Sequence, residues 1–319
     1  MIENLDYSSA LKEDIVLHLL QCKDTLTIAS YHRRISQLHD WDDFLVDKSF
    51  KEEDSINEEL VNEWVLKLKH SGLADRTIMT YVNALRKFLL FYSQKSAEVV
   101  YIPPSHKYDD DYIPYLFTDD EMEDIYKLAD NYKKGYKNQA RYIEIELPIL
   151  IRLFDCCGFR LNELITLSME DVDLKAGVIR IIMNAKNGRQ RLVPLESEMT
   201  EQLKSYSAKM GLVEGTAQCL FPYRSPKEPL SRGNVENAFN SILVTMGIRK
   251  KGGNNHKRGP CIHCLRHRFV FRSIKQLMAH GITLEDSIPY LSIYLGHDSL
   301  YETEKYMKFS AEMFPEEWE

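Results

Sequence analysis

Apolar residues recur every three to four positions through much of the first hundred residues, which is the spacing of helices that bury one face. Ser55 and Glu58 form a capping-box pattern that predicts the start of one helix. Its apolar positions are Leu60, Val61, Trp64, Val65 and Leu68. Another helix is predicted after Ala74 and Asp75. Its apolar positions are Ile78, Tyr81, Leu85, Phe88 and Leu89. Residues 1–100 are therefore expected to form a helical domain.

Residues 101–116 break this periodicity. Pro103, Pro104 and Pro114 flank a run of three aspartates, and such a stretch can neither propagate a helix nor pack into a core. We predict that these residues form a linker, which leaves residues 117–319 as a second domain.

The second domain is predicted to combine helices with a small sheet. Thr118 and Glu121 form another capping-box pattern, a long apolar segment spans residues 143–157, and helical periodicity resumes after Leu230. Two β-rich runs, GVIRIIM and RLVPL, are separated by NAKNGRQ. The Asn-Gly pair in that loop favours a β-hairpin with Lys186 at or beside its tip. The predicted fold class is mainly α (α+β), with a small antiparallel β-sheet in the second domain.

Length and composition narrow the class of protein. A chain of 319 residues with 44% hydrophobic content is long enough for two buried cores. The sequence has no run of eighteen apolar residues and does not start with a secretory pattern, so a cytoplasmic protein is expected. Six cysteines are too few for a disulfide framework, and Cys22, Cys156 and Cys157 are expected to be reduced core residues.

The net charge of −7 argues against binding to a phosphate backbone, but the charges are distributed unevenly. Residues 224–275 carry twelve basic residues against two acidic ones, and residues 175–191 carry five basic residues and no acid. Most of the charged residues in 109–130 and in 298–319 are acidic. The basic segments favour nucleic-acid binding, with an ordinary solvated surface as the alternative. Their candidate DNA contacts are Arg189, Arg232, Lys257 and Arg258.

The helix predicted after Ala74 also has a polar and basic face opposite its apolar one. That face consists of Arg76, Thr77, Thr80, Asn83, Arg86 and Lys87. Such a face suits a helix that lies against a phosphate backbone, and a solvated helix face is the alternative. The predicted DNA contacts on it are Arg76, Thr77, Arg86 and Lys87.

Six residues form an ordered series of cationic, proton-transferring and nucleophilic side chains. They are Arg160, Lys186, His263, Arg266, His297 and Tyr306. Each lies in a short segment with its own pattern: CGFRLNEL, NAKNGRQRLVPL, HCLRH, and LGH followed nine residues later by a tyrosine. Each residue alone has an ordinary structural explanation, and Tyr301 is another tyrosine close to Tyr306. The order and the local contexts together carry the functional interpretation.

This set of side chains fits the cleavage of a DNA phosphodiester without a metal ion. Such cleavage needs a nucleophile, cationic donors on the non-bridging oxygens, and an acid that protonates the leaving 5′-oxygen. Arg160 and Arg266 are the predicted clamp, because a guanidinium donates two parallel hydrogen bonds and keeps its charge. Glu163 follows Arg160 by three residues, which on a helix lets the carboxylate hold the guanidinium.

The remaining residues supply proton transfer and attack. Lys186 on a hairpin turn has the reach to serve as the general acid. His263 and Arg266 are expected on one face of a helix, where the histidine accepts the nucleophile's proton or binds the phosphate. Tyr306 is the predicted nucleophile. Because a tyrosine hydroxyl has an ordinary pKa of about 10, it needs these cations nearby to attack at neutral pH.

The pattern resembles the tyrosine recombinase (phage integrase) family over nearly the whole chain. The resemblance implies a helical core-binding (SAM-like) DNA-binding domain at residues 1–100 and a catalytic domain of the tyrosine recombinase fold at 117–319. It implies that the six residues form the active site, that His297 contacts the phosphate, and that Tyr306 forms a 3′-phosphotyrosyl intermediate. The expected activity is site-specific DNA recombination, in integration, transposition or Xer-like resolution. No metal ion and no nucleotide cofactor would be needed.

The resemblance also implies a partner and an assembly. The partner would be double-stranded DNA with inverted-repeat core sites, bound by a tetramer on paired DNA, with no membrane involved. The thirteen residues after Tyr306, MKFSAEMFPEEWE, place apolar side chains among acids. We expect this tail to dock on a neighbouring protomer, so that deleting residues 311–319 weakens assembly on paired sites.

Three alternatives and two departures from the family pattern stay open. A type IB topoisomerase uses the same tyrosine chemistry, and a binding-only protein would form no covalent adduct. A zinc module of Cys261, His263, Cys264 and His267 has crowded spacing and lacks a second ligand pair at finger spacing. The stretch from residue 266 to 297 is somewhat longer than the compact family version. The negative net charge is unusual for the family, and it is expected to weaken non-specific DNA binding.

Overall fold

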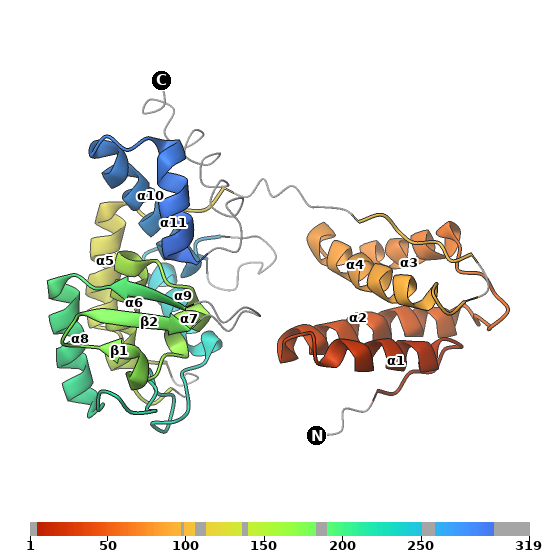
Figure 1. Ribbon diagram of the computed structural model, residues 1–319, viewed down its shortest axis with the longest axis horizontal. Coiled ribbons are helices and arrows are strands. Elements are labelled where there is room, and N and C mark those ends of the chain that lie inside the picture. Colours follow the sequence, from red (N-terminus) through yellow and green to blue (C-terminus); the bar gives the residue numbers. More distant parts are fainter. Residues whose placement is uncertain are drawn as a thin grey trace. The chain divides into compact units, whose positions relative to one another are not determined.

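The computed structural model describes residues 5–96, 99–105, 113–135, 140–182, 190–250 and 259–296 (Figure 1). The chain divides into two compact units, Met1–Asp111 and Tyr112–Glu319. In the described residues the architecture is mainly helical, with one three-stranded antiparallel sheet in the second unit. The predicted fold class is confirmed.

The first unit is a bundle whose described helices are α1 (Lys12–Lys23), α2 (Ile28–Asp47), α3 (Glu58–His70) and α4 (Asp75–Tyr92). The capping box predicted at Ser55 and Glu58 is wrong. Asn57 is the N-cap of α3, and its side chain accepts a hydrogen bond from the Leu60 backbone N–H at 2.9 Å. The reason is local competition, because asparagine caps a helix as well as serine does and here stands directly before the first helical residue.

Helix α4 contacts the other three helices of the first unit. Trp41 and Trp64 are fully buried where α2 and α3 meet, and their rings pack edge to face at 5.2 Å. Each such aromatic side chain stabilises the fold by about 1.5–3 kcal/mol through burial of apolar area. His18 on α1 lies against Phe88, and burial lowers its pKa to about 4, so this histidine is neutral in the core.

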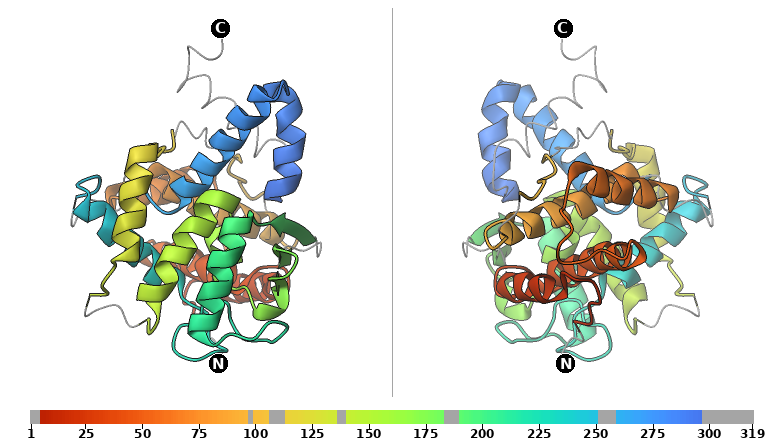
Figure 2. Two further views of the ribbon diagram at one scale, coloured as in Figure 1. Left: turned by 90° about the vertical axis from the view of Figure 1, so that its left-hand side faces the viewer. Right: turned by 90° about the vertical axis from the view of Figure 1, so that its right-hand side faces the viewer.

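The second unit is built around α6 (Ile143–Cys157), which contacts four other helices. These are α5 (Asp119–Asp130), α8 (Ser197–Met210), α9 (Arg232–Thr245) and α10 (His263–Ala279). Short helix α7 (Leu161–Ile165) follows α6, and α11 (Leu284–Leu295) folds back beside α10 (Figure 2). The capping box at Thr118 and Glu121 is confirmed, since each residue bonds the backbone N–H of the other.

The sheet has the strand order β1 (Val172–Asp173), β2 (Val178–Ile182) and β3 (Gln190–Pro194), preceded by the 3-10 turn η1 (Met169–Asp171). β2 and β3 pair antiparallel from Val178 opposite Pro194 to Ile182 opposite Gln190. The predicted hairpin is therefore confirmed in its strands. Alternate residues of β3 are buried, as expected for a strand with one face on a core.

Helix α6 buries a carboxyl group within its otherwise apolar face. Glu146 is fully buried, and neither of its carboxylate oxygens has a hydrogen-bond partner among the described residues. Burial raises the pKa of this carboxyl to about 8, so it is largely protonated at neutral pH.

Of the three cysteines expected in the core, only Cys157 is buried, whereas Cys156 and Cys22 are half-buried. Adjacent helix positions point in different directions, so Cys156 and Cys157 cannot both face the core.

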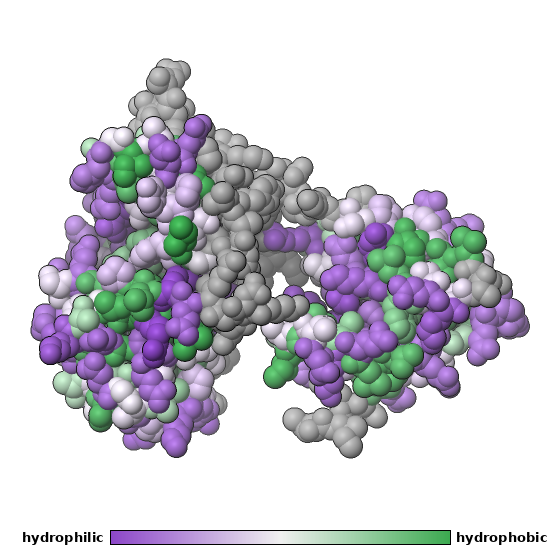
Figure 3. Space-filling model, viewed as in Figure 1, coloured by the Kyte–Doolittle hydropathy of each residue, from purple (hydrophilic) through white to green (hydrophobic). Residues whose placement is uncertain are grey.

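The surface mixes polar and apolar side chains. Hydrophilic residues cover much of the face in Figure 3, with hydrophobic residues in smaller patches. The most exposed large apolar side chains described in the second unit are those of Ile293, Leu192 and Tyr290. In the described part of the chain, no helix combines the length and apolar character needed to cross a membrane.

Candidate active site

Arg160 is placed by the turn that joins α6 to α7. Helix α6 ends at Cys157, and its C-cap Gly158 adopts the left-handed conformation with φ of 62°. Arg160 is then the N-cap of α7, and Glu163 accepts hydrogen bonds from both the Arg160 backbone N–H and its Nη1, each at 2.9 Å. An arginine side chain has no acceptor, so this is one half of a capping box in which the carboxylate does all the accepting.

Glu163 also binds Arg191 on β3, which the sequence had shown only as one of several basic residues. The Arg191 Nη2 and Nη1 groups donate to the two oxygens of Glu163 at 2.8 and 3.1 Å, and the arginine is 9% exposed. Burial alone would raise the pKa of the Glu163 carboxyl, but hydrogen bonds and charge from Arg191, with those from Arg160, outweigh it and lower that pKa. The carboxylate thus holds two guanidinium groups from different elements side by side.

Arg266 enters from α10 and is 1% exposed. Its Nη1 donates to the Gly158 carbonyl, 108 residues earlier, and its Nη2 donates to the Leu295 carbonyl at 3.2 Å. Burial of a guanidinium is tolerated only when acceptors surround it, which explains why two backbone carbonyls at helix ends face it. The last carbonyl groups of α6 and α11 carry partial negative charge, and they have no hydrogen-bond donor within their own helix.

Arg160 and Arg266 converge on the same atom. Arg160 Nη1 lies 3.4 Å from the Leu295 carbonyl oxygen, the acceptor of Arg266 Nη2, and 3.3 Å from that of Gly296. Segments that are far apart in the sequence therefore bring two guanidinium groups to the end of α11. With Arg191 behind Glu163, the arrangement concentrates positive charge suited to a tetrahedral anion such as a phosphate.

The remaining described member of the predicted series, His263, is the first residue of α10 and is exposed. Its ring packs edge to face against that of His267, with the centroids 4.7 Å apart. Arg266, three residues along the same helix, is buried beneath. Among the described residues, no group of three or more His, Cys, Asp or Glu side chains is arranged to hold a metal ion, so the zinc module at residues 261–267 has no geometric support.

Several predicted site residues fall outside the described residues. They are Lys186, Arg189, Lys257, Arg258, His297 and Tyr306. The first two belong to the hairpin loop between β2 and β3, and the last two follow Gly296.

The predicted DNA contacts that are described have different surroundings. On α4, Arg76 and Lys87 are exposed and Thr77 is half-buried. Arg86 is half-buried, and its Nη1 donates to the Pro103 carbonyl, so one donor fastens the segment after α4. At the start of α9, Arg232 is exposed and pairs with Glu236 at 2.8 Å.

A second ion network, which the sequence did not reveal, fixes α10 to the rest of the unit. Arg268 donates to Asp155 on α6, to Asp119 at the start of α5, and to the Phe117 carbonyl. Asp155 also accepts from Arg272 at 3.0 Å. Because Arg268 lies two residues after Arg266, this network sets the position of the helix that carries the buried guanidinium.

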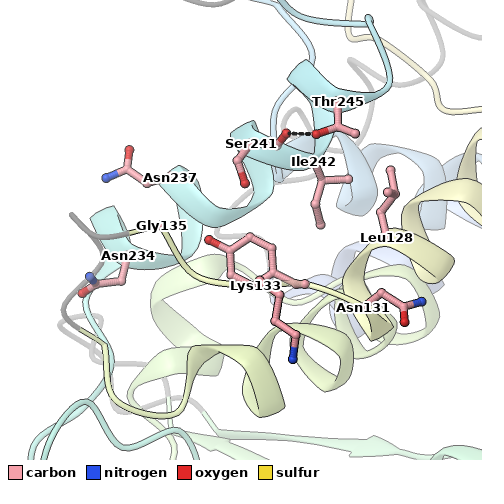
Figure 4. A pocket seen from close by; sticks show the side chains of 10 residues that line it. Leu128, Asn131, Lys133, Gly135, Asn234, Asn237, Ser241, Ile242 and Thr245 are labelled. Atoms are coloured by element: carbon pink, nitrogen blue, oxygen red, sulfur yellow. Dashed lines mark hydrogen bonds between the residues drawn. The ribbon is translucent and has the colours of Figure 1, made fainter.

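One groove lies elsewhere, between the end of α5 and α9. Its volume is about 690 Å³, and its lining includes Asn131, Lys133, Asn234, Asn237 and Ser241 (Figure 4). None of the converging arginines lines it. Of the converging arginines, Arg266 and Arg191 are buried and Arg160 is half-buried.

We predict that Glu163→Gln lowers the free energy of unfolding by about 2 kcal/mol at pH 7, because it weakens charge-assisted hydrogen bonds to two guanidinium groups. The folded pKa of Glu163 lies below its unfolded value of about 4.3. Its stabilising contribution is therefore complete above that unfolded pKa and is lost as the pH falls through the folded pKa. Denaturant titrations of wild type and variant at pH 7 and in acid measure this difference.

The matched control for this prediction is Glu170→Gln, which changes an exposed glutamate on η1 in the same way. It should alter stability by less than about 0.5 kcal/mol. A Glu163 variant as stable as this control at pH 7 would remove the assigned role of the carboxylate.

Comparison with known proteins identifies the family of this chain. The sequence model of the phage integrase family matches residues 116–313. A Sinorhizobium fredii protein named as an integrase or recombinase is 29% identical over 211 residues, which is 64% of this chain and 64% of that protein. Tyrosine recombinase XerD of Staphylococcus aureus is 25% identical over 292 residues, which is 89% of this chain and 88% of XerD.

Solved structures share the fold. The XerH site-specific recombinase bound to its difH substrate has a TM-score of 0.64 at 20% identity, and covers 91% of this chain and 80% of its own. A lambda integrase fragment bound to a core site has a TM-score of 0.66 at 17% identity, and covers 91% and 96%. The chain belongs to the phage integrase family. It is a tyrosine recombinase, an enzyme that cuts and rejoins DNA at specific sites.

Proposed function

We propose that Tyr306 attacks the scissile phosphate while Arg160 and Arg266 bind its non-bridging oxygens. Attack by the phenolic oxygen forms a 3′-phosphotyrosyl bond and releases a 5′-hydroxyl, and attack of a partner strand's 5′-hydroxyl reverses the step on the new strand. Lys186 protonates the leaving 5′-oxygen, His263 exchanges the tyrosine proton, and His297 binds the phosphate. The charge of the clamp offsets the charge that develops on the phosphate oxygens.

The single observation that carries this proposal is the shared Leu295 carbonyl. Two guanidinium groups, one from the N-cap of α7 and one from α10, reach that one oxygen, which precedes Tyr306 by eleven residues in the sequence. Glu163 and Arg191 support the Arg160 side of the pair. A site with this charge stabilises a phosphate transition state without a catalytic metal ion.

The DNA partner is proposed to carry inverted-repeat core sites. Residues 1–100 are proposed to bind the core DNA as a separate domain, with 101–116 as the linker and 117–319 as the catalytic domain. Arg76 and Lys87 on α4, with Arg232 on α9, are exposed cations that suit phosphate contacts. We propose a tetramer on paired DNA in which each apolar tail docks on a neighbour. The reaction would take place in the cytoplasm, as integration, transposition or resolution.

The test of this function is covalent attachment to DNA. A binding site is first enriched from a random duplex library, then prepared with a nick beside the scissile phosphate so that the cut end is lost and the adduct accumulates. Wild-type protein should give a protein–DNA band that resists denaturation, and Tyr306→Phe should abolish it. A band that survives in Tyr306→Phe and disappears in the matched control Tyr301→Phe would show that the nucleophile is wrongly assigned.

A further inference from the structure

Two cysteines flank His263 in the sequence Cys261-Ile262-His263-Cys264. The Cys264 backbone N–H donates to the Cys261 carbonyl at 2.9 Å, which closes a four-residue turn immediately before and into α10. The two sulfur atoms lie 3.8 Å apart. A turn closed in this way keeps its end Cα atoms within about 7 Å, and a disulfide joins Cα atoms about 4.4–6.8 Å apart, so this pair can be bridged by a small tightening of the turn.

The two thiols differ in access and in acidity. Cys261 is half-buried and Cys264 is fully buried. The hydrogen bond from the Cys264 thiol, helped by backbone N–H groups of His263 and Cys264, outweighs burial and lowers the pKa of Cys261 to about 6. Thiols in Cys-x-x-Cys sequences at helix starts are commonly acidified in this way. By contrast, the hydrogen bond from Cys156 and burial raise the pKa of Cys157, and burial raises that of Cys219.

We propose that Cys261 and Cys264 form a reversible disulfide that switches off this recombinase, an inference that rests on the proposed function of His263 and Arg266. The oxidant is a small-molecule disulfide such as oxidised glutathione. The Cys261 thiolate attacks one of its sulfurs and displaces the first thiolate, and Cys264 then attacks the Cys261 sulfur and displaces the second. Two cysteine thiols lose two electrons and two protons, and the small-molecule disulfide gains them as two thiols.

The bridge is expected to disturb the active site because it draws the two sulfur atoms together and so shifts the residues of the turn. Its formation shortens the sulfur separation from 3.8 Å to about 2.05 Å, and His263 lies inside the bridged turn. Arg266 lies two residues after Cys264, and its guanidinium is held between the Gly158 and Leu295 carbonyls. Displacing catalytic groups by about 1 Å can lower a rate by about 10²-fold, so the oxidised protein should be strongly inhibited.

The experiment compares full-length protein after dithiothreitol with protein after oxidised glutathione. Peptide mapping without reduction locates any disulfide, and the DNA adduct assay measures activity. The expected result is a Cys261–Cys264 bridge, a loss of adduct formation of at least about tenfold, and full recovery on reduction. Cys261→Ser should form adduct at the same rate before and after oxidation. Cys219→Ser, a cysteine variant away from the turn, should respond as wild type does.

Two outcomes overturn the inference. One is a map in which glutathione or a bridge appears on other cysteines while Cys261 and Cys264 stay reduced. The other is a complete Cys261–Cys264 bridge with unchanged adduct formation. If the reduced wild-type protein forms no adduct at all, the proposed function fails instead, and the map alone still decides whether the pair is a site of oxidation.

Discussion

Arg266→Lys should lower the rate of covalent DNA attachment by about 10³-fold, the scale seen when a preorganised donor to a developing oxyanion is removed. Lysine keeps the charge but replaces a planar fork by a single ammonium group on a flexible stem. In the folded protein that fork reaches the Gly158 and Leu295 carbonyls together, which a single nitrogen cannot do in the same geometry. Single-turnover adduct formation at saturating protein measures the rate.

The control for this prediction is Arg268→Lys on the same helix. Arg268 is also buried, but it binds Asp155, Asp119 and the Phe117 carbonyl instead of the Leu295 carbonyl. Both variants should lose stability in denaturant titrations, and only Arg266→Lys should lose adduct formation by much more than about tenfold. Equal losses of activity in the two variants would mean that Arg266 acts through folding alone.

Gly158→Ala should lower the free energy of unfolding by about 2–4 kcal/mol. About 1 kcal/mol of this comes from placing a Cβ atom at a left-handed position, and the remainder from overpacking. A Cβ at residue 158 would overlap a ring carbon of Phe269, on the α10 helix that carries Arg266. The substitution should therefore push α10 away and reduce adduct formation as well as stability.

The chain offers a close control in Gly211, which ends α8. Its backbone has φ of 66° and ψ of 31°, against 62° and 31° at Gly158, but no atom lies within 4 Å of a built Cβ. Gly211→Ala should lower stability by only about 1 kcal/mol and leave adduct formation intact. Denaturant titrations of the two variants isolate the contact with Phe269, and equal losses would show that this close approach has no energetic effect.

The parts of the fold that could be predicted from the sequence depend on local signals. Thr118 and Glu121 are three residues apart, the apolar positions from Ile78 to Leu89 repeat within one helix, and an Asn-Gly pair separates the strands of the hairpin. In each case the interacting residues are close together in the sequence, so their spacing alone predicts the local geometry. The error at the start of α3 is also local, because Asn57 and Ser55 are both good caps and Asn57 stands directly before the first helical residue.

The supporting contacts of the site could not be predicted in this way. Arg191 reaches Glu163 across 28 residues, and Arg268 reaches Asp155 across 113. No periodicity links residues so far apart, and a basic residue in a strand looks the same whether it faces water or a buried carboxylate. The order of the predicted active-site residues indicated the family, which the comparisons confirmed, but only the fold brings Arg160 and Arg266 to one oxygen.

Both guanidinium groups are proposed to act on the charge of one scissile phosphate. This proposal is tested most directly by replacing a non-bridging oxygen of that phosphate with a methyl group, which removes the negative charge. Adduct formation is then measured for wild type, Arg160→Ala and Arg266→Ala on both DNA substrates. Each alanine variant is expected to lose at least about 10²-fold on the phosphate and much less on the neutral methylphosphonate. An equal loss on both substrates, for either arginine, would contradict the proposal.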